Sequence, residues 1–425
     1  MSESSEQSGF RPDAQPDNRP MPLADARARI IAAITPVVET ERVALADTLH
    51  RVLAEDLQSD IDVPGADNSS MDGYGFAAAD APEHGARLRV VGESFAGHPF
   101  DGRLAPGECI RIMTGAVVPP GVDTIVMQEN TRTDDSHVVI DTVPARGSNV
   151  RPAGEDLARG DAVMSAGTYL RPADIAVVAS IGRPEVAVFR RPRVAFFSTG
   201  DELRPIDGPI EPGQIYDSNR YGLAALLDEL GMDGINMGVV GDSPEALRAA
   251  FKKASTADAI VTSGGVSVGA ADFVLDVLGE QGRVDFWRVA IKPGKPLAFG
   301  TVGDARFFGL PGNPVSTAVT FLQLVRPALV RMAGGTPAPA TRFVLPTRTA
   351  LDKRPGRENF LRARMEMDGT TPGVRAIDHQ GSGVMRSMSA ANCFIVLPAE
   401  LGEVAAGTDV VVEPFAQAIW DHPAD

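Results

Sequence analysis

Cysteine is scarce in this 425-residue chain, which contains only Cys109 and Cys393. The two residues stand alone and far apart, so neither a disulfide framework nor a cysteine-rich zinc site is expected. The six histidines are also scattered, without an HExxH motif or a pair spaced four residues apart. The usual sequence signatures of a zinc site are therefore missing.

Positive charge is in deficit. The formal net charge is −16 and the sequence pI is about 4.9. A sequence-independent nucleic-acid binder carries a basic surface, because its affinity comes from neutralising phosphates. The composition excludes that class of protein. A small anionic ligand stays possible if Lys, Arg or backbone N–H groups cluster locally.

Long apolar runs are absent too, and no stretch approaches the roughly 20 residues that a membrane-spanning helix needs. Residues 1–20 are polar and rich in Ser, Asp and Pro, without the apolar core of a signal peptide. We therefore expect a cytoplasmic protein with a disordered N-terminal tail.

What is present is the composition of a soluble globular protein, with 44% apolar and 23% charged residues. The length predicts two to four domains, at roughly 100–200 residues for each. We predict a disordered tail at 1–20, a helical linker domain formed by 21–58 with 160–190, a β-rich insertion domain at 59–159, a doubly wound domain at 191–333 and a C-terminal β-domain at 341–417.

The linker prediction rests on apolar spacing. Residues 22–33 and 172–181 have helical periodicity, and residues 42–57 carry a further apolar periodic stretch. Between them, short apolar runs split by Gly and Pro are typical of a β-rich domain.

From Arg193 onward, buried-type strands alternate with helices, which predicts an open, mostly parallel sheet covered by helices on both faces. The predicted strands are VAFFST, INMGVV, DAIVTS, FWRVAI and ARFFGL, and the predicted helices are 218–230, one opening at 242–245, 271–278 and 314–332. Short β-like runs such as NFLRARM and CFIVL then fill residues 343–415.

Ligands of such sheets bind outside the carboxyl ends of the strands. Glycines, acids and lysines collect there in this sequence. They are Glu202 after the first strand, Asp242 after the second, the SGGVSVG loop (263–269) and Asp272 after the third, KPGKP (292–296) after the fourth and PGNP (311–314) after the fifth.

The SGGVSVG loop matches neither a P-loop nor a GxGxxG dinucleotide motif, so ATP hydrolysis and NAD binding have no support. Consecutive N–H groups and serine hydroxyls at a helix start suit a phosphate. Close packing of the helix on the strand is an equally good reason for such glycines.

The lysines and acids allow more than one interpretation. In an acidic protein, Lys292 and Lys295 on a proline-braced turn favour anion binding over mere solubility. Glu202, Asp242 and Asp272 could bind Mg²⁺, which takes oxygen ligands and shares them with phosphates. They could equally be helix caps.

With these residues in view, the chain resembles the MoeA family, which is related to the E-domain of gephyrin. The resemblance runs in consistent order from about residue 21 to 415. The motifs that carry it are NSSMDGYG (68–75), RIMTG (111–115), GED (154–156), STGDE (198–202), SGGVSVG with Asp272, KPGKP, and GLPGNPVS (309–316).

The resemblance implies an α/β multidomain protein with a helical linker domain, a β-rich insertion, a doubly wound MogA-like pterin-binding domain and a C-terminal β-barrel. It also implies an elongated homodimer. The active cleft would combine the doubly wound and C-terminal domains of one subunit with Asp72 and Thr114 from the β-rich domain of the other.

The implied activity is that of a transferase, a molybdopterin molybdenumtransferase, which inserts molybdenum from molybdate into adenylylated molybdopterin with Mg²⁺ and releases AMP. Implied catalytic residues are Asp72, Thr114, Glu202, Asp242 and Asp272, the last three also as Mg²⁺ ligands. Implied cofactor-binding residues are Ser263, Gly264, Gly265, Ser267, Gly269, Lys292, Lys295, Pro311, Asn313 and Pro314.

Departures from the family are small. Gly75 stands where the family usually has Ala, and the C-terminal GHQGS-like segment appears as 378–382, followed by Arg386 and Ser387. Arg357 and Arg362 could join the anion site or lie on a solvated strand face.

Two other functions stay open. The related adenylyltransferase shares the doubly wound domain but would lack the segments on either side of it. A receptor-clustering scaffold, like the gephyrin E-domain, is disfavoured because the strand-end acids and both lysines are retained. Transient contacts with the adenylyltransferase and with recipient molybdoenzymes are expected, and none with nucleic acid or membrane.

Overall fold

The computed structural model describes residues 20–266 and 273–415. Their contacts divide the chain into two compact units. The first consists of Met1–Glu41, His50–Val52 and Phe189–Asp425, and the second of Arg42–Leu49 and Leu53–Val188. The tail expected at 1–20 lies, apart from Pro20, outside the described residues. None of the helices described is long and apolar enough to cross a membrane.

The first unit contains a six-stranded sheet in the order β16-β13-β17-β21-β20-β18. The first four strands are parallel, and β20 is antiparallel to both its neighbours. This confirms the mostly parallel sheet predicted from the apolar runs. The strands are β13 (Arg193–Thr199), β16 (Asp233–Val240), β17 (Ala259–Ser263), β18 (Gly282–Arg288), β20 (Pro296–Val302) and β21 (Ala305–Leu310).

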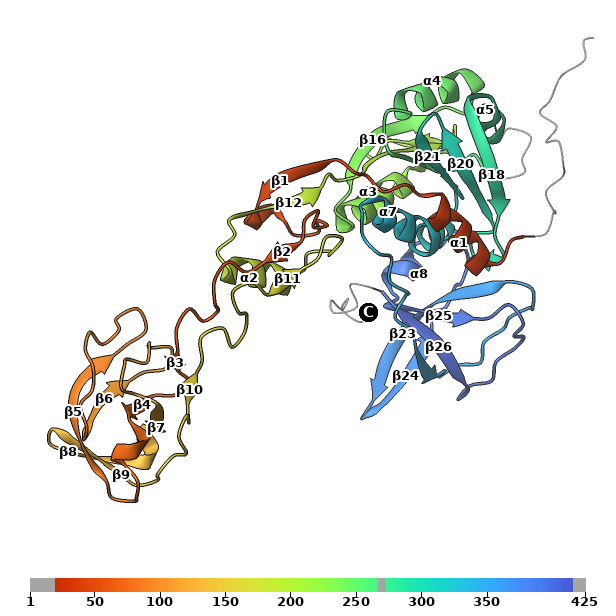
Figure 1. The fold of residues 1–425 in the computed structure, drawn as a ribbon. Coiled ribbons are helices and arrows are strands. Elements are labelled where there is room, and N and C mark those ends of the chain that lie inside the picture. The colour runs from red at the N-terminus through yellow and green to blue at the C-terminus, as the bar shows by residue number, and fades with distance from the viewer. Residues whose placement is uncertain (1–19, 267–272, 416–425) are drawn as a thin grey trace, which may run out of the picture. The chain divides into compact units, whose positions relative to one another are not determined.

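Helices cover both faces of this sheet (Figure 1). They are α1 (Leu23–Ala33), α3 (Ser218–Glu229), α4 (Pro244–Ala254), α5 (Val274–Gln281) and a closing helix made of α6 (Pro314–Thr320), the π-helical turn η4 (Phe321–Val325) and α7 (Arg326–Met332). The helix predicted to open at 242–245 is confirmed as α4, and its N-cap is Ser243, whose hydroxyl accepts from the Ala246 N–H.

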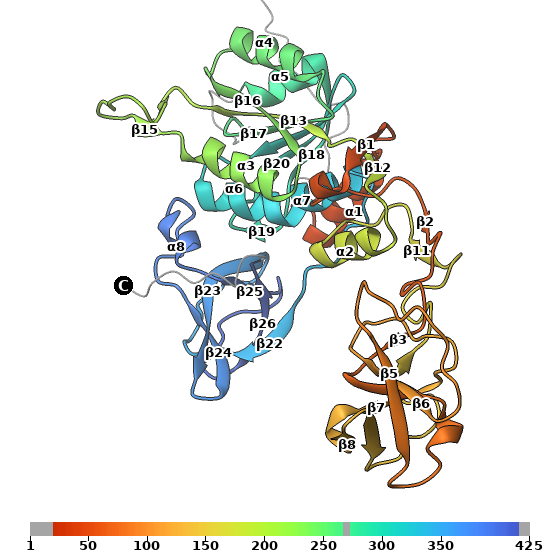
Figure 2. The same ribbon diagram turned by 90° about the vertical axis from the view of Figure 1, so that its left-hand side faces the viewer.

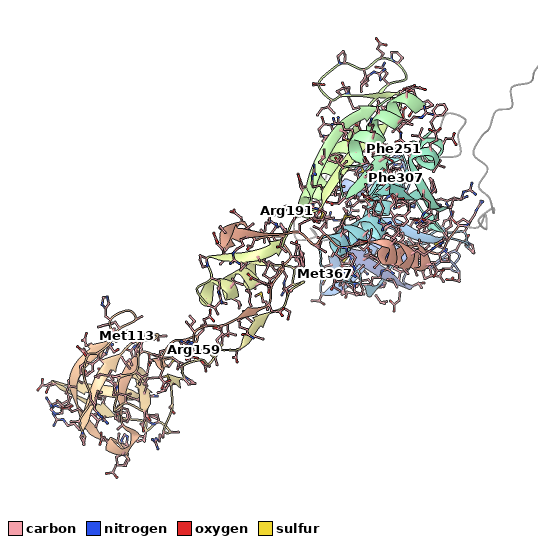
Figure 3. All side chains as sticks on the ribbon, turned by 45° about the horizontal axis from the view of Figure 1, so that its top comes forward. Met113, Arg159, Arg191, Phe251, Phe307 and Met367 are labelled. Carbon is pink, nitrogen blue, oxygen red and sulfur yellow. The ribbon has the colours of Figure 1, made fainter. Side chains whose placement is uncertain are left out.

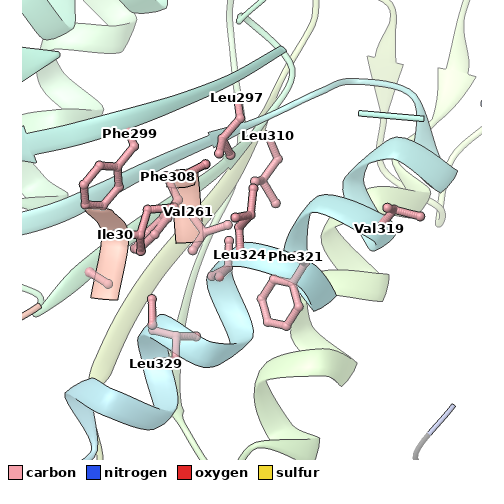
Figure 4. Close-up of a cluster of buried hydrophobic side chains, with 14 of the residues drawn as sticks. Ile30, Val261, Leu297, Phe299, Phe308, Leu310, Val319, Phe321, Leu324 and Leu329 are labelled. Carbon is pink, nitrogen blue, oxygen red and sulfur yellow. The ribbon is translucent and has the colours of Figure 1, made fainter. Parts of the chain in front are cut away.

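One face packs against α1, α3 and the closing helix. Phe299, Phe308 and Leu310 of the sheet belong to the same buried cluster as Phe321 and Leu324 of the closing helix (Figure 4). On the other face, the rings of Phe251 (α4) and Phe307 (β21) meet edge to face at 5.4 Å (Figure 3). Such dry layers hold the strand ends at fixed positions.

Helix α1 was assigned to a helical linker domain, but its buried residues Leu23, Ala26 and Ile30 pack into the core of the sheet unit. The apolar spacing predicts the helix correctly, whereas its packing partners, such as Val194 and Leu329, lie about 160 to 300 positions later in the chain.

The C-terminal β-domain belongs to the first unit. Its strands are β22 (Phe343–Pro346), β23 (Glu358–Asp368), β24 (Thr371–Ala376), β25 (Cys393–Leu397) and β26 (Asp409–Pro414). They follow the order β24-β23-β25-β26-β22, and a bridge between Thr347 and Val374 joins the end of β22 to β24 and closes the ring. The expected barrel is therefore present.

One further strand connects the two parts of this unit. β19 (Ile291–Lys292) comes from the sheet domain but pairs in parallel with β23, with Lys292 opposite Asn359. The lysine-bearing turn is thereby fixed against the C-terminal barrel.

The second unit holds a six-stranded sheet in the order β7-β4-β6-β5-β9-β8, as the β-rich prediction required. Its strands are β4 (Gly73–Phe76), β5 (Arg87–Ser94), β6 (Glu108–Ile112), β7 (Thr124–Met127), β8 (Thr131–Asp134) and β9 (His137–Ile140).

The linker segments are less helical than predicted. α2 (Pro172–Ser180) is present, but residues 42–57 form parts of β1 (Thr40–Ala44) and β2 (Leu57–Gln58) around a short 3₁₀ turn, η1 (Leu45–Asp47). β11 (Ala162–Met164) and β12 (Glu185–Phe189) are strands as well. Leu53 and Leu57 pack with Val186 and Val188, so extended segments bury the apolar residues that a helix was expected to bury.

Candidate functional site

A pocket of about 680 Å³ lies at the carboxyl edge of the sheet in the first unit. Thr199 at the end of β13, Asp242 after β16 and Ser263 at the end of β17 contribute to its walls. Figure 2 shows these strands beside α3 and α6, whose N-terminal segments also border the pocket. The predicted residues that line it are Glu202, Asp242, Ser263, Gly264, Gly265, Pro311, Asn313 and Pro314.

The glycines after β17 have a steric reason to be there. Gly264 has φ +96°, and a Cβ atom on it would lie 2.4 Å from the Thr199 carbonyl oxygen. Gly265 has φ +69°, and its Cβ would lie 2.3 Å from a methyl carbon of Val274. Only glycine fits this close approach. Ser267, Gly269 and Asp272 lie outside the described residues.

Two of the groups expected to hold phosphate are already engaged. The Gly264 N–H donates to the Leu310 carbonyl at 3.0 Å. The buried Ser263 hydroxyl accepts from the Asn219 side chain at 2.7 Å and lies 3.4 Å from the Pro311 carbonyl oxygen, to which it donates. Both groups therefore have partners within the pocket wall, and their role in binding a ligand stays a prediction.

Two of the three predicted acids lie in one pocket. Glu202 and Asp242 line the same pocket, and the carboxylate of Asp201, which was not predicted, accepts from the Asp242 N–H at 3.2 Å. Burial, and then the negative charges of Asp201 and Glu202, raise the pKa of Asp242. No group of three metal-ligating side chains gathers within residues 20–266 and 273–415, a range that leaves out Asp272.

A second pocket, of about 820 Å³, lies between the sheet domain and the C-terminal barrel. Lys292 and Arg357 line it, together with His379 and Ser382 of the loop after β24. The two pockets adjoin, because Pro296 and Asn313 line both. Together they form one crevice, in which the first pocket carries acids and the second carries both cations and the acids Asp352 and Asp378.

The two lysines of KPGKP separate. Both lysines are exposed, but Lys292 lines the second pocket and Lys295 lines neither pocket. The turn between them is tightly packed, since a Cβ atom on Gly294 would lie 2.6 Å from a methyl carbon of Thr320. A rigid turn was correctly predicted, but it directs only one lysine into the crevice.

Arg362 lines the second pocket but is not on a solvated strand face. It is 1% exposed, and burial lowers its pKa to about 10. Its guanidinium donates to the Ser387 hydroxyl at 3.0 Å and to the Gly381 carbonyl at 3.1 Å. The Gln380 side chain bonds both the N–H and the carbonyl of Arg362. Arg362 therefore braces the loop that lines the second pocket.

The predicted helix 218–230 is confirmed as α3, but the pocket residues around its start were not predicted. Asp217 is buried, caps the helix and accepts from the Ser198 hydroxyl at 2.9 Å and from the Arg220 guanidinium at 2.8 Å. Tyr216, Asp217 and Asn219 all line the first pocket. An aspartate just before an amphipathic helix is a capping signal that could have found Asp217. No local pattern indicates Asn219.

In the second unit, Asp72 and Thr114 meet. The Thr114 N–H and hydroxyl both donate to Asp72 Oδ1, at 2.8 and 2.7 Å. These bonds, the backbone one first, lower the pKa of Asp72. The pairing joins the MDGY and MTG motifs, which are 42 positions apart in sequence.

Fold and crevice define a class: a multidomain α/β protein whose doubly wound domain opens, at its strand ends, onto a polar crevice shared with a C-terminal barrel. Family models match the chain in three parts. The MoeA N-terminal region (domain I and II) matches residues 21–182, the probable molybdopterin binding domain 195–331 and the MoeA C-terminal region (domain IV) 344–415.

Whole-chain relatives agree. A molybdopterin molybdenumtransferase of Haemophilus influenzae is 41% identical over 92% of this chain and 98% of its own, and one of Nostoc sp. is 39% identical over 92% and 94%. The solved MoeA protein of Pyrococcus horikoshii OT3 matches with a TM-score of 0.81 at 27% identity, over 93% of this chain and all of its own. The chain belongs to the MoeA family, as its motifs indicated.

Proposed function

We propose that this chain is a molybdopterin molybdenumtransferase, which inserts molybdenum from molybdate into adenylylated molybdopterin and releases AMP. The observation that carries the proposal is the joined crevice, with Glu202 and Asp242 in one pocket and Lys292 and Arg357 in the next. A reaction between a nucleotide-linked cofactor and an oxyanion needs two adjoining subsites of this kind. The names of the relatives support the same activity.

In this proposal the second pocket receives molybdate. Lys292, Arg357 and Arg362 outnumber the acids Asp352 and Asp378 on its walls, which favours an anion in a chain of net charge −16. Arginine and lysine N–H groups are good donors to oxyanions. The nucleotide-linked pterin then occupies the first pocket, with its phosphates beside the glycines that follow β17.

The carboxylates of the first pocket fit a Mg²⁺ ion. They supply oxygen ligands. Burial, followed by repulsion from Asp201 and Glu202, raises the pKa of Asp242, and a bound dication would relieve the repulsion. Glu202 and Asp242, together with Asp272, would hold the ion, which would neutralise phosphate charge. The protein groups otherwise act by positioning the reactants and by stabilising developing charge.

We further propose a cytoplasmic homodimer in which a second copy of the chain supplies Asp72 and Thr114 to this crevice. Their mutual hydrogen bonds keep Asp72 ionised and oriented, as a group that acts on a ligand must be. Transient contacts with the adenylyltransferase that makes the substrate, and with recipient molybdoenzymes, would complete the pathway.

The test is AMP release from adenylylated molybdopterin by the purified protein, with and without molybdate. We expect molybdate-dependent release in the wild type and severely reduced turnover in Asp242→Asn. A folded protein that releases no AMP would contradict the proposal and favour a scaffold. If instead ATP and free molybdopterin were joined by the protein, the adenylyltransferase activity would be the correct assignment.

A further inference from the structure

Between β13 and α3 the chain makes an excursion away from the main sheet. It contains β14 (Leu203–Arg204) and β15 (Ile215–Tyr216), which pair in parallel. Figure 2 shows β15 on this excursion, outside the layers of the sheet domain. Leu203, Ile215 and Tyr216 line the 680 Å³ pocket, so the base of the excursion forms one of its walls.

Tyr216 is the only aromatic residue on the described walls of this pocket. Its side chain is 42% exposed, so part of the ring is accessible to a ligand in the pocket. Its hydroxyl donates to the Gly208 carbonyl at 2.9 Å, within the same excursion. The polar end of the side chain is thus satisfied, and the ring is what the residue offers to a ligand.

The backbone beneath this ring is also fixed. Asp217, the next residue, is 1% exposed and is held by the Ser198 hydroxyl and the Arg220 guanidinium. The Tyr216 ring is therefore tethered at both ends, by its hydroxyl and by its Cα. An aromatic surface held in this way loses little conformational entropy when a flat ligand stacks on it.

We infer that Tyr216 is a stacking platform for a planar heteroaromatic ring bound in the first pocket. The inference rests on the proposed function and adds a subsite to it. The proposed substrate contains two planar heteroaromatic rings, the adenine of the nucleotide and the pterin, and either could stack on Tyr216. Stacking of a base on an aromatic side chain typically contributes about 1–3 kcal/mol, which corresponds to a roughly five- to hundredfold change in affinity.

The test compares three probes by titration calorimetry: AMP, ribose 5-phosphate, which lacks a base, and 6-hydroxymethylpterin, which lacks the nucleotide. Tyr216→Leu should weaken AMP or the pterin by roughly five- to hundredfold and leave ribose 5-phosphate unchanged. Tyr216→Phe keeps the ring and should keep the affinity. Tyr221→Leu is a matched control, because Tyr221 is 45% exposed but does not line the pocket.

If Tyr216→Leu weakens only the binding of AMP, the platform stacks on adenine. If it weakens only the binding of 6-hydroxymethylpterin, the platform stacks on the pterin. The inference would be overturned by a wild type that binds neither ring, by equal loss of ribose 5-phosphate, or by a Phe variant as weak as the Leu variant. AMP release is assayed separately. If ring binding depends on Tyr216 but the protein releases no AMP, the stacking role of Tyr216 stands and the proposed function is wrong.

Discussion

The side-chain amide of Asn219, in the first turn of α3, donates to the Ser263 hydroxyl at 2.7 Å and to the Gly312 carbonyl at 2.7 Å. Ser263 ends β17, and Gly312 lies in the loop after β21. One side chain thus ties a helix to two strand-end segments that border the same pocket.

We therefore predict that Asn219→Ala lowers the free energy of unfolding by about 1–3 kcal/mol, because the buried Ser263 hydroxyl loses its donor. Turnover should fall by more than the loss of folded protein accounts for, because the segments that contain Ser263 and Gly312 are no longer held together. Urea denaturation and AMP release measure the two effects. Asp228→Ala, an exposed change on the same helix, is the control. Wild-type turnover in Asn219→Ala would show that the two Asn219 hydrogen bonds are not needed for activity.

Asp242 should show a trade-off between stability and activity. Its folded-state pKa is raised, so the folded protein binds its proton more tightly than the unfolded chain does. The wild type should therefore lose stability as pH rises from the ordinary carboxyl value of 3.8 through the raised value.

Asp242→Asn lacks this titration, so its stability relative to wild type should increase across the same pH interval while its turnover collapses. Urea unfolding at a series of pH values, paired with AMP release, tests both statements. If the stability of Asp242→Asn relative to wild type falls as pH rises, the fold stabilises the Asp242 carboxylate and its folded-state pKa is lowered, which contradicts the prediction.

Arg362 should affect oxyanion binding through the loop that it braces. Arg362→Met removes the donors to Ser387 and Gly381, so the loop that lines the second pocket loses its support. We expect a loss of about 1–3 kcal/mol in the free energy of unfolding and weaker binding of molybdate, measured by urea denaturation and calorimetry.

Arg362→Lys retains a buried donor and should recover part of the molybdate affinity. The exposed Arg375 on β24, which pairs with Glu366, provides a control as Arg375→Met. Unchanged molybdate binding in Arg362→Met, with the fold intact, would mean that the loop is held by Gln380 alone.

The pairing of Thr114 with Asp72 makes a prediction for the second unit. Thr114→Val removes the hydroxyl but keeps the N–H, which is the larger of the two influences that lower the Asp72 pKa. The pKa of Asp72 should therefore rise part of the way to its ordinary value, and Thr114→Ser should leave it low. Carboxyl carbon NMR titration, with Asp72→Asn to assign the signal, measures this directly. Equal pKa values in the Val and Ser variants would count against a role for the hydroxyl.

Local patterns in the sequence were enough to predict the main sheet and its helices. Strands such as β13 and β17 are continuous apolar runs, and α4 begins with a capping serine followed by proline. These signals act between near neighbours along the chain. The helical prediction for residues 42–57 was wrong, because extended segments can bury the same apolar residues when strands lie beside them.

The sequence by itself determined the family, the sheet and the set of residues at its carboxyl edge, because motif identity and strand periodicity are local properties. Only the tertiary structure decided which polar groups remain free to meet a ligand. Ser263 is engaged by Asn219, 44 positions away. Lys292 reaches the crevice while Lys295 does not, and Arg362 supports a loop. A hydrogen bond satisfied by a residue distant in sequence leaves no trace in the local pattern, so availability for binding is a property of the folded chain.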